Sequence, residues 1–139
     1  MAIIYNAVGV KIPLFKHRKT TNWIRKVAET YHKKIGDISY VFCSDAEILR
    51  VNQEYLHHDY YTDIISFDYS AGNTLSGDLF ISTETVRSNA AQYHTDEQEE
   101  FRRVMIHGIL HLCGFGDKTA RGAAAMRMQE NEALLSYEL

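Results

Sequence analysis

Two histidines one helical turn apart, followed by a carboxylate, are the residues of this chain best suited to chemistry. His107 and His111 lie in the apolar stretch 104–112, where an i, i+4 spacing places both imidazoles on one helix face. Two buried imidazoles without partners are costly, whereas a divalent cation satisfies both through one nitrogen lone pair each. Gly114 can turn the chain and return Asp117 as a third ligand. The sequence therefore predicts a metal site of His107, His111 and Asp117.

The predicted ligand set favours a metal-dependent hydrolase. Three protein ligands leave an open coordination position, as in catalytic zinc sites, where a metal lowers the pKa of water or polarises a substrate oxygen. The alternative is a pair of core histidines bonded to backbone or carboxylate groups. The Gly114 turn, Asp117 and the apolar helix together favour the metal. The spacing also resembles the metzincin peptidases, but Gly108 stands where their glutamate acts as general base, which argues against peptide hydrolysis.

The patterns around this site predict an α+β fold. Thr95 to Gln98 has the capping-box spacing of a helix that runs through Cys113 and is ended by Gly114. Further helices are expected over residues 20–34 (ended by Gly36), 44–55, 83–93 and 119–136. Strands are expected over residues 2–10, 38–43, 63–69 and 75–81, the last two as a hairpin through 71–73. We predict a small mixed sheet of about four strands packed with about five helices, with the metal site on a buried central helix.

The composition is that of an ordinary globular protein, and we predict a single domain over residues 1–139. Hydrophobic residues make up 45% and charged residues 24% of the chain, which argues against a disordered protein. No apolar run is long enough to cross a membrane, and we recognise no signal peptide, so a cytoplasmic location is expected. Cys43 and Cys113 lie in neither a CxxC nor a disulfide-framework pattern and are expected to be free. Cys113 follows His111 by two and is an alternative metal ligand, but on a helix this offset turns it away from the histidine face.

A basic stretch near the N-terminus contrasts with the net charge of −3. Eight of the fifteen basic residues lie between Lys11 and Lys34, with Glu29 the only acidic residue among them. These eight residues are Lys11, Lys16, Arg18, Lys19, Arg25, Lys26, Lys33 and Lys34. Such a stripe can hold a polyanion, although a run of charges is more often a solvated helix face.

Three segments agree with one known pattern. The stretch from His107 to Asp117 is a specific motif, and residues 62–67 (Thr-Asp-Ile-Ile-Ser-Phe) and 77–82 (Gly-Asp-Leu-Phe-Ile-Ser) support it. These motifs resemble those of the YbeY family of bacterial rRNA maturation endoribonucleases, and Met126 and Glu130 fit its final helix. The resemblance implies a single-strand-specific, metal-dependent endoribonuclease that acts in 16S rRNA 3′-end maturation and in ribosome quality control. It implies single-stranded rRNA and the small ribosomal subunit as partners, without a membrane or a nucleotide cofactor.

The resemblance also implies one zinc ion at His107, His111 and Asp117, with two departures from the family pattern. Most relatives have histidine in place of Asp117. A carboxylate still binds zinc, but as a harder ligand it can shift the preference towards manganese or magnesium. Many relatives have arginine in place of Leu56, and leucine cannot contact a phosphate. His57 or His58 can replace that arginine if protonated, although both are expected to be exposed loop residues.

The other residues of the expected reaction stay open. The general base is unknown, and the polar candidates are Asp63, Asp78 and His58. RNA is expected to follow the basic stretch and to stack on exposed aromatic residues, for which the candidates are Tyr60, Tyr61 and Tyr93. Two rival functions are a metallohydrolase of another substrate and a ribosome-assembly factor whose zinc is structural. The open metal position argues against the assembly factor, and the missing arginine at position 56 argues for it.

Overall fold

The computed structural model describes residues 2–57 and 62–138. In these ranges the chain forms four strands and five helices, which confirms the predicted α+β class. In chain order they are β1 (Ile3–Ala7), α1 (His17–Thr30), β2 (Lys34–Cys43), α2 (Asp45–Leu56), β3 (Ile64–Asp68), β4 (Thr74–Ser82), α3 (Thr83–Tyr93), α4 (Glu97–Leu112) and α5 (Ala120–Tyr137).

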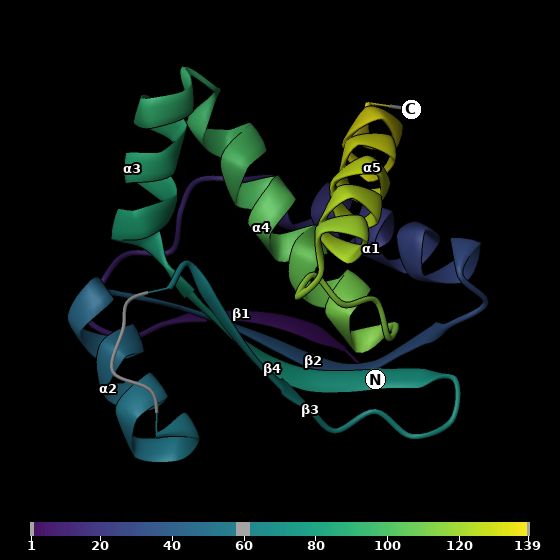
Figure 1. Cartoon of the computed structure of the whole chain (residues 1–139), viewed down its shortest axis with the longest axis horizontal. Coiled ribbons are helices and arrows are strands. Elements are labelled where there is room, and N and C mark those ends of the chain that lie inside the picture. Colours follow the sequence, from purple (N-terminus) through teal and green to yellow (C-terminus); the bar gives the residue numbers. More distant parts are fainter. Residues whose placement is uncertain (1, 58–61, 139) are drawn as a thin grey trace.

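The four strands form one mixed sheet in the order β1-β2-β4-β3. β1 and β2 are parallel, β2 and β4 are parallel, and β3 pairs antiparallel with β4 as the predicted hairpin. Helices α1, α3, α4 and α5 lie over one face of the sheet, whereas α2 packs against the other face (Figure 1). The sheet therefore separates a large helical layer from one short helix.

Helix α4 occupies the centre of the helical layer, as the apolar stretch predicts (Figure 1). Nine of its sixteen residues are buried, so it is enclosed on nearly every side. The Tyr40 hydroxyl of β2 donates a hydrogen bond of 2.8 Å to the carbonyl of Met105. Gly108 lies so close to the sheet that a Cβ there would come within 2.9 Å of Ile64 Cδ1 and 3.2 Å of Leu79 Cδ1. The helix thus rests directly on β3 and β4 between the two histidines.

The region around α1 differs most from the sequence prediction. The helix begins at His17, three residues before the predicted start, and ends at Thr30. It ends where His32 takes a left-handed conformation with φ of 62°. Gly36 does not end it and instead lies inside β2, where a Cβ would come within 2.5 Å of Ser76 Oγ. The glycine therefore allows β2 and β4 to approach, and β2 starts earlier than predicted.

Side-chain caps fix where the other helices begin. Ser44 caps α2 and Thr119 caps α5, each accepting a hydrogen bond from the backbone N–H three residues further on. The predicted start of α4 is wrong by one residue, because its cap is Asp96 rather than Thr95, and the Asp96 carboxylate accepts a bond of 3.0 Å from the Glu99 N–H. A carboxylate at this end is also favoured by the helix dipole.

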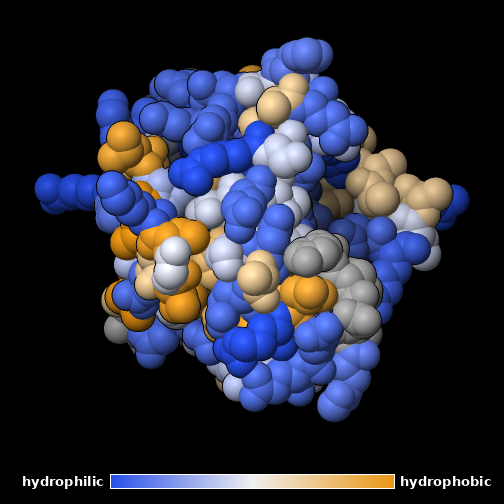
Figure 2. Space-filling view, turned by 90° about the vertical axis from the view of Figure 1, so that its left-hand side faces the viewer, coloured by the Kyte–Doolittle hydropathy of each residue, from blue (hydrophilic) through white to orange (hydrophobic). Residues whose placement is uncertain are grey.

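Nine large apolar side chains of the described residues are exposed, and Leu14 and Leu135 are the most exposed of them. The face on the side of α2 and α3 is covered mainly by hydrophilic residues, with apolar residues gathered in one part of it (Figure 2). None of the helices in the described ranges combines the length and hydropathy that crossing a membrane requires.

The contact at Gly108 leads to a prediction about stability. Replacing Gly108 by leucine forces a side chain between α4 and the sheet, and such overpacking costs about 1–3 kcal/mol. We expect the melting temperature, followed by circular dichroism, to fall by about 4–10 °C. The matched control is Ala124→Leu on exposed α5, which should change it little. Equal melting temperatures for the two variants would contradict this account of α4.

Candidate functional site

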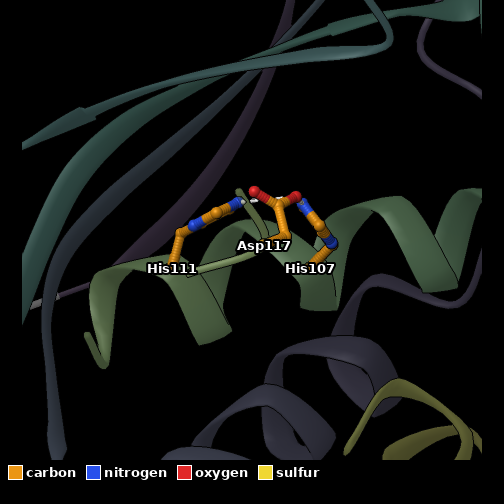
Figure 3. Close-up of side chains that lie close together, drawn as sticks. All are labelled: His107, His111 and Asp117. Carbon is orange, nitrogen blue, oxygen red and sulfur yellow. Dashed lines mark ion pairs between the residues drawn. The ribbon is translucent and has the colours of Figure 1, made fainter. Parts of the chain in front are cut away.

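The last two turns of α4 carry both histidines of the predicted site. His107 and His111 are partly buried, and their ring centroids lie 4.5 Å apart at an interplanar angle of 80°. Both rings project from the same side of α4, and Asp117 lies between them (Figure 3). The i, i+4 spacing therefore produces the convergence that the sequence predicts.

The turn after α4 returns Asp117 to the histidines. Gly114 has a φ of 104°, and its N–H bonds to the His111 carbonyl at 2.9 Å while the Phe115 N–H bonds to the Leu110 carbonyl at 3.1 Å. This pair of bonds is the Schellman arrangement, in which glycine takes the left-handed residue. Asp117 Oδ2 consequently lies 3.3 Å from His107 Nε2 and 3.5 Å from His111 Nε2.

The three side chains have the geometry of a ligand set. One donor atom from each of His107, His111 and Asp117 lies within 4.8 Å of the other two. Imidazole nitrogens and a carboxylate oxygen are ligands of zinc and of several other divalent metals. The donor chemistry and the convergence fit a metal ion. Cys113 does not belong to this group, and burial raises the pKa of its thiol to about 11, which disfavours the thiolate that binds metals.

Glu130 on α5 contacts the Nδ1 side of the His107 ring, whereas Asp117 lies at the Nε2 side. Its Oε2 lies 2.6 Å from His107 Nδ1, and the Glu130 side chain is almost fully buried. An ionised carboxylate only accepts hydrogen bonds, so in the neutral ring Nδ1 carries the proton and Nε2, which faces Asp117, keeps its lone pair. Burial disfavours the imidazolium, but the bond to Glu130 and its charge outweigh burial and raise the pKa of His107. Glu130 thus selects the tautomer that a metal ligand needs.

Arg103 in turn holds Glu130. Its Nη1 lies 2.9 Å from Glu130 Oε1, and its Nη2 donates to Asn131 Oδ1 at 2.9 Å. Burial raises the pKa of Glu130, but the hydrogen bonds from His107 and Arg103 outweigh this effect and keep the pKa below its usual value. The carboxylate is therefore ionised at neutral pH, and the chain Arg103–Glu130–His107 links α4 to α5.

The three ligand candidates open into a cleft of about 500 Å³ between α4, α2 and the edge strand β3. Its lining residues are Asn52, Leu56, Thr62, Asp63, Ile64, Ile65, Ser66, Asp68, His107, His111, Leu112, Asp117 and Lys118.

The candidates for a general base divide between the cleft and other parts of the molecule. Asp63 lines the cleft, and burial raises the pKa of its carboxyl against the opposing effect of His107. Asp78 lies elsewhere, in a hollow beside Tyr55 and Phe80. His58 lies outside the described residues. Of the two candidates that the structure describes, Asp63 is therefore the one that the fold brings to the ligand set.

The residues expected to contact RNA are placed differently from the metal ligands. None of the eight basic residues between Lys11 and Lys34 is among the residues that line the cleft. Tyr93 is 62% exposed at the end of α3 and does not line it either. The stacking candidates Tyr60 and Tyr61 lie outside the described residues. Stacking on any of the three tyrosines stays a prediction.

The position where arginine was expected is filled by an apolar side chain. Leu56 ends α2 and lines the cleft. His57 follows it as an exposed residue with φ of 57° and is not among the lining residues. Among the described lining residues, the lysine is Lys118, next to Asp117. Lys118 is not among the residues predicted from the sequence, although its position next to the third ligand was a signal for it.

Together, the mixed α+β fold and this three-donor site define a protein of the metal-dependent hydrolase type. A family profile described as "Endoribonuclease YbeY" matches residues 6–138. Proteins named Endoribonuclease YbeY from Bacteroides fragilis and Phocaeicola vulgatus are 58% and 55% identical to the chain, over 96% and 99% of both sequences. The chain therefore belongs to the endoribonuclease YbeY family, which implies RNA as its substrate class.

One solved structure supports the fold independently. The solution structure of TM1509 from Thermotoga maritima superimposes with a TM-score of 0.67 at 20% sequence identity, covering 98% of this chain and 89% of that protein. At this identity the likeness concerns the fold alone.

The Glu130–His107 contact leads to a prediction about metal affinity. Replacing Glu130 by glutamine removes the charge that holds the Nδ1 proton, and the loss of such a partner weakens metal binding by about 10–100-fold. We expect this loss in a chelator-competition titration with zinc. The matched control is Glu132→Gln, an exposed position on the same helix, which should bind as the wild type does. Equal affinities for the two variants would show that Glu130 does not support the ligand.

Proposed function

We propose that this chain is a zinc-dependent endoribonuclease that cleaves single-stranded RNA, in 3′-end maturation of 16S rRNA and in ribosome quality control. The proposal places this activity in one domain over residues 1–139 and in the cytoplasm, with the small ribosomal subunit as partner. The observation that carries it is the convergence of His107, His111 and Asp117 in an open cleft. Membership of the endoribonuclease YbeY family supports RNA as the substrate.

His107, His111 and Asp117 would hold the metal, with Glu130 fixing the first ring. A divalent metal in this position supplies a Lewis acid for phosphodiester hydrolysis. Zinc fits two imidazoles and one carboxylate, and the hard carboxylate of Asp117 also accommodates manganese or magnesium. The half-exposed Asp117 leaves the ligand set accessible to substrate from the cleft.

Two further residues can act on a bound RNA strand. The ammonium group of Lys118, an exposed lining residue of the cleft, can attract a phosphate. Asp63 lies in the same cleft with a raised pKa, so it can hold or accept a proton near the reacting phosphate. We assign no general base among these residues, and Asp63 is the first carboxylate to test.

Metal loading is the first prediction of this proposal. Protein purified without a histidine tag should carry about one equivalent of transition metal by mass spectrometry. His111→Ala should lose this metal, together with at least about 100-fold of single-stranded RNA cleavage. His94→Ala, at an exposed position that ends α3, is the control. Cleavage that persists equally after chelation and in His111→Ala would refute a metal-dependent reaction.

The absence of an arginine at position 56 favours one alternative, a metal-containing ribosome-assembly factor without catalytic activity. In that case His111→Ala lowers the melting temperature, yet the chain binds pre-ribosomal particles whenever it is folded. RNA cleavage by the wild type that depends on metal excludes this alternative.

Lys118 generates a separate prediction. Replacing Lys118 by glutamine removes the cation of the cleft and should reduce RNA cleavage by about tenfold. This reduction in rate is smaller than the one caused by removing a buried hydrogen-bond donor to the transition state, because Lys118 is exposed to water. Metal content should be unchanged, and Lys11→Gln serves as the matched control. If both variants cleave RNA at the wild-type rate, Lys118 has no role in contacting the phosphate.

A further inference from the structure

A second hollow of about 850 Å³ lies between α1 and the end of α5. Its apolar floor includes the buried side chains of Trp23 and Tyr137. The indole Nε1 of Trp23 donates to the carbonyl of Ala133 at 2.7 Å, which ties α1 to α5 beneath the groove. We call this hollow the α1–α5 groove. Within the described ranges it shares no lining residue with the metal cleft.

The rim of the α1–α5 groove is positively charged. Among the described residues, four basic side chains line it, from Lys16, Arg18, Lys19 and Lys26, and no carboxylate does. Lys19 has a long contact of 3.9 Å with Glu138, and both side chains are well exposed. Within residues 2–57 and 62–138, Lys16, Arg18 and Lys26 form no ion pair. Three of the four cations therefore have no ion-pair partner in the part of the chain that the structure describes.

The start of α1 adds to this charge. The helix has no acidic residue in its first turn, and its N-cap, Lys16, makes no side-chain capping bond. The free N–H groups and the helix dipole therefore favour an anion at the end where three of the cations gather. From Lys16 to Thr30 the lining residues extend about 20 Å along the helix, which is the shape of a linear polyanion rather than of a single small anion.

The groove is joined to the metal site through α5. Glu130, which holds His107, and Tyr137, in the groove floor, lie on the same helix, about 10 Å apart along its axis. The groove and the ligand set are therefore held in a fixed relation to each other by one helix of the same molecule.

We propose that the α1–α5 groove binds the phosphate backbone of single-stranded RNA outside the segment that is cleaved. The proposal rests on the proposed endoribonuclease function for the identity of the polyanion. The groove adds affinity for long strands by charge, without reading the bases. An acidic protein surface is the competing occupant, and the elongated shape of the groove favours RNA because the phosphates of a strand follow one another in a line.

The test measures binding and cleavage by the full chain as purified. The groove variant is Lys16→Gln/Lys26→Gln. The matched control, Lys11→Gln/Lys34→Gln, removes the same charge at exposed residues of the same basic stretch that do not line the groove. Fluorescence anisotropy follows binding of a labelled single-stranded oligodeoxyuridylate, which has the same phosphate charge but lacks the ribose hydroxyl. Strands of about 16 and about four nucleotides are compared, and circular dichroism checks that both variants fold.

The groove variant should bind the long strand about five- to tenfold more weakly than the control at about 50 mM salt. The slope of log Kd against log salt concentration should be smaller for the groove variant by about 0.7 for each phosphate contact that is lost. The short strand should bind both variants equally. Equal affinities of the two variants for the long strand would overturn the proposal.

Cleavage of RNA by the same variants separates this proposal from the proposed function. Both variants should cleave a short RNA at the wild-type rate, and only the groove variant should have a raised KM for a long RNA. If both variants cleave RNA equally, the proposal that the groove binds RNA is wrong, whereas the proposed endoribonuclease function stands. If the protein cleaves no RNA but its binding of the long strand depends on the groove, the proposed endoribonuclease function is wrong and the proposal for the groove stands.

Discussion

The packing of α4 against the sheet is the contact on which the site depends. Gly108 removes the side chain that would separate the helix from Ile64 and Leu79, so α4 rests on β3 and β4. The sheet occupies the side of α4 on which Gly108 lies. The side chains of His107 and His111, at either side of this contact, therefore project into the cleft beside β3. The same contact explains why no glutamate follows the first histidine: a residue at 108 points into the core.

The site also depends on elements that arrive from other parts of the chain. Asp117 is returned by the Gly114 turn, and the cap of α5 by Thr119 starts the next helix two residues later. That helix brings Glu130 against His107. The ligand set is thus held from the sheet below, from the turn and from α5, which leaves the cleft as its accessible side.

The sequence predicts those features of the fold and the site that depend on contacts between residues close together in the chain. His107, His111 and Asp117 lie within eleven residues, so helix periodicity and one glycine sufficed to bring them together. The predicted α+β fold was correct because most helices and strands carry their own patterns. Gly36 was misassigned because a glycine after a helix and a glycine between strands look alike in sequence. The role of Glu130 depends on a contact 23 residues away, which no local pattern encodes.

The route by which α5 completes the site has a consequence for synthesis of the chain. His107 and His111 leave the ribosome before Glu130 does, and during that interval the ring of His107 lacks the carboxylate that fixes its tautomer. The hydrogen bonds of α1 to α5, from Trp23 to Ala133 and between Thr20 and Tyr137, likewise cannot form until α5 has been synthesised. A nascent chain that has folded its sheet and α4 therefore still has an unsupported site. A nuclease assembled in this order gains a competent centre only after α5 has emerged and docked.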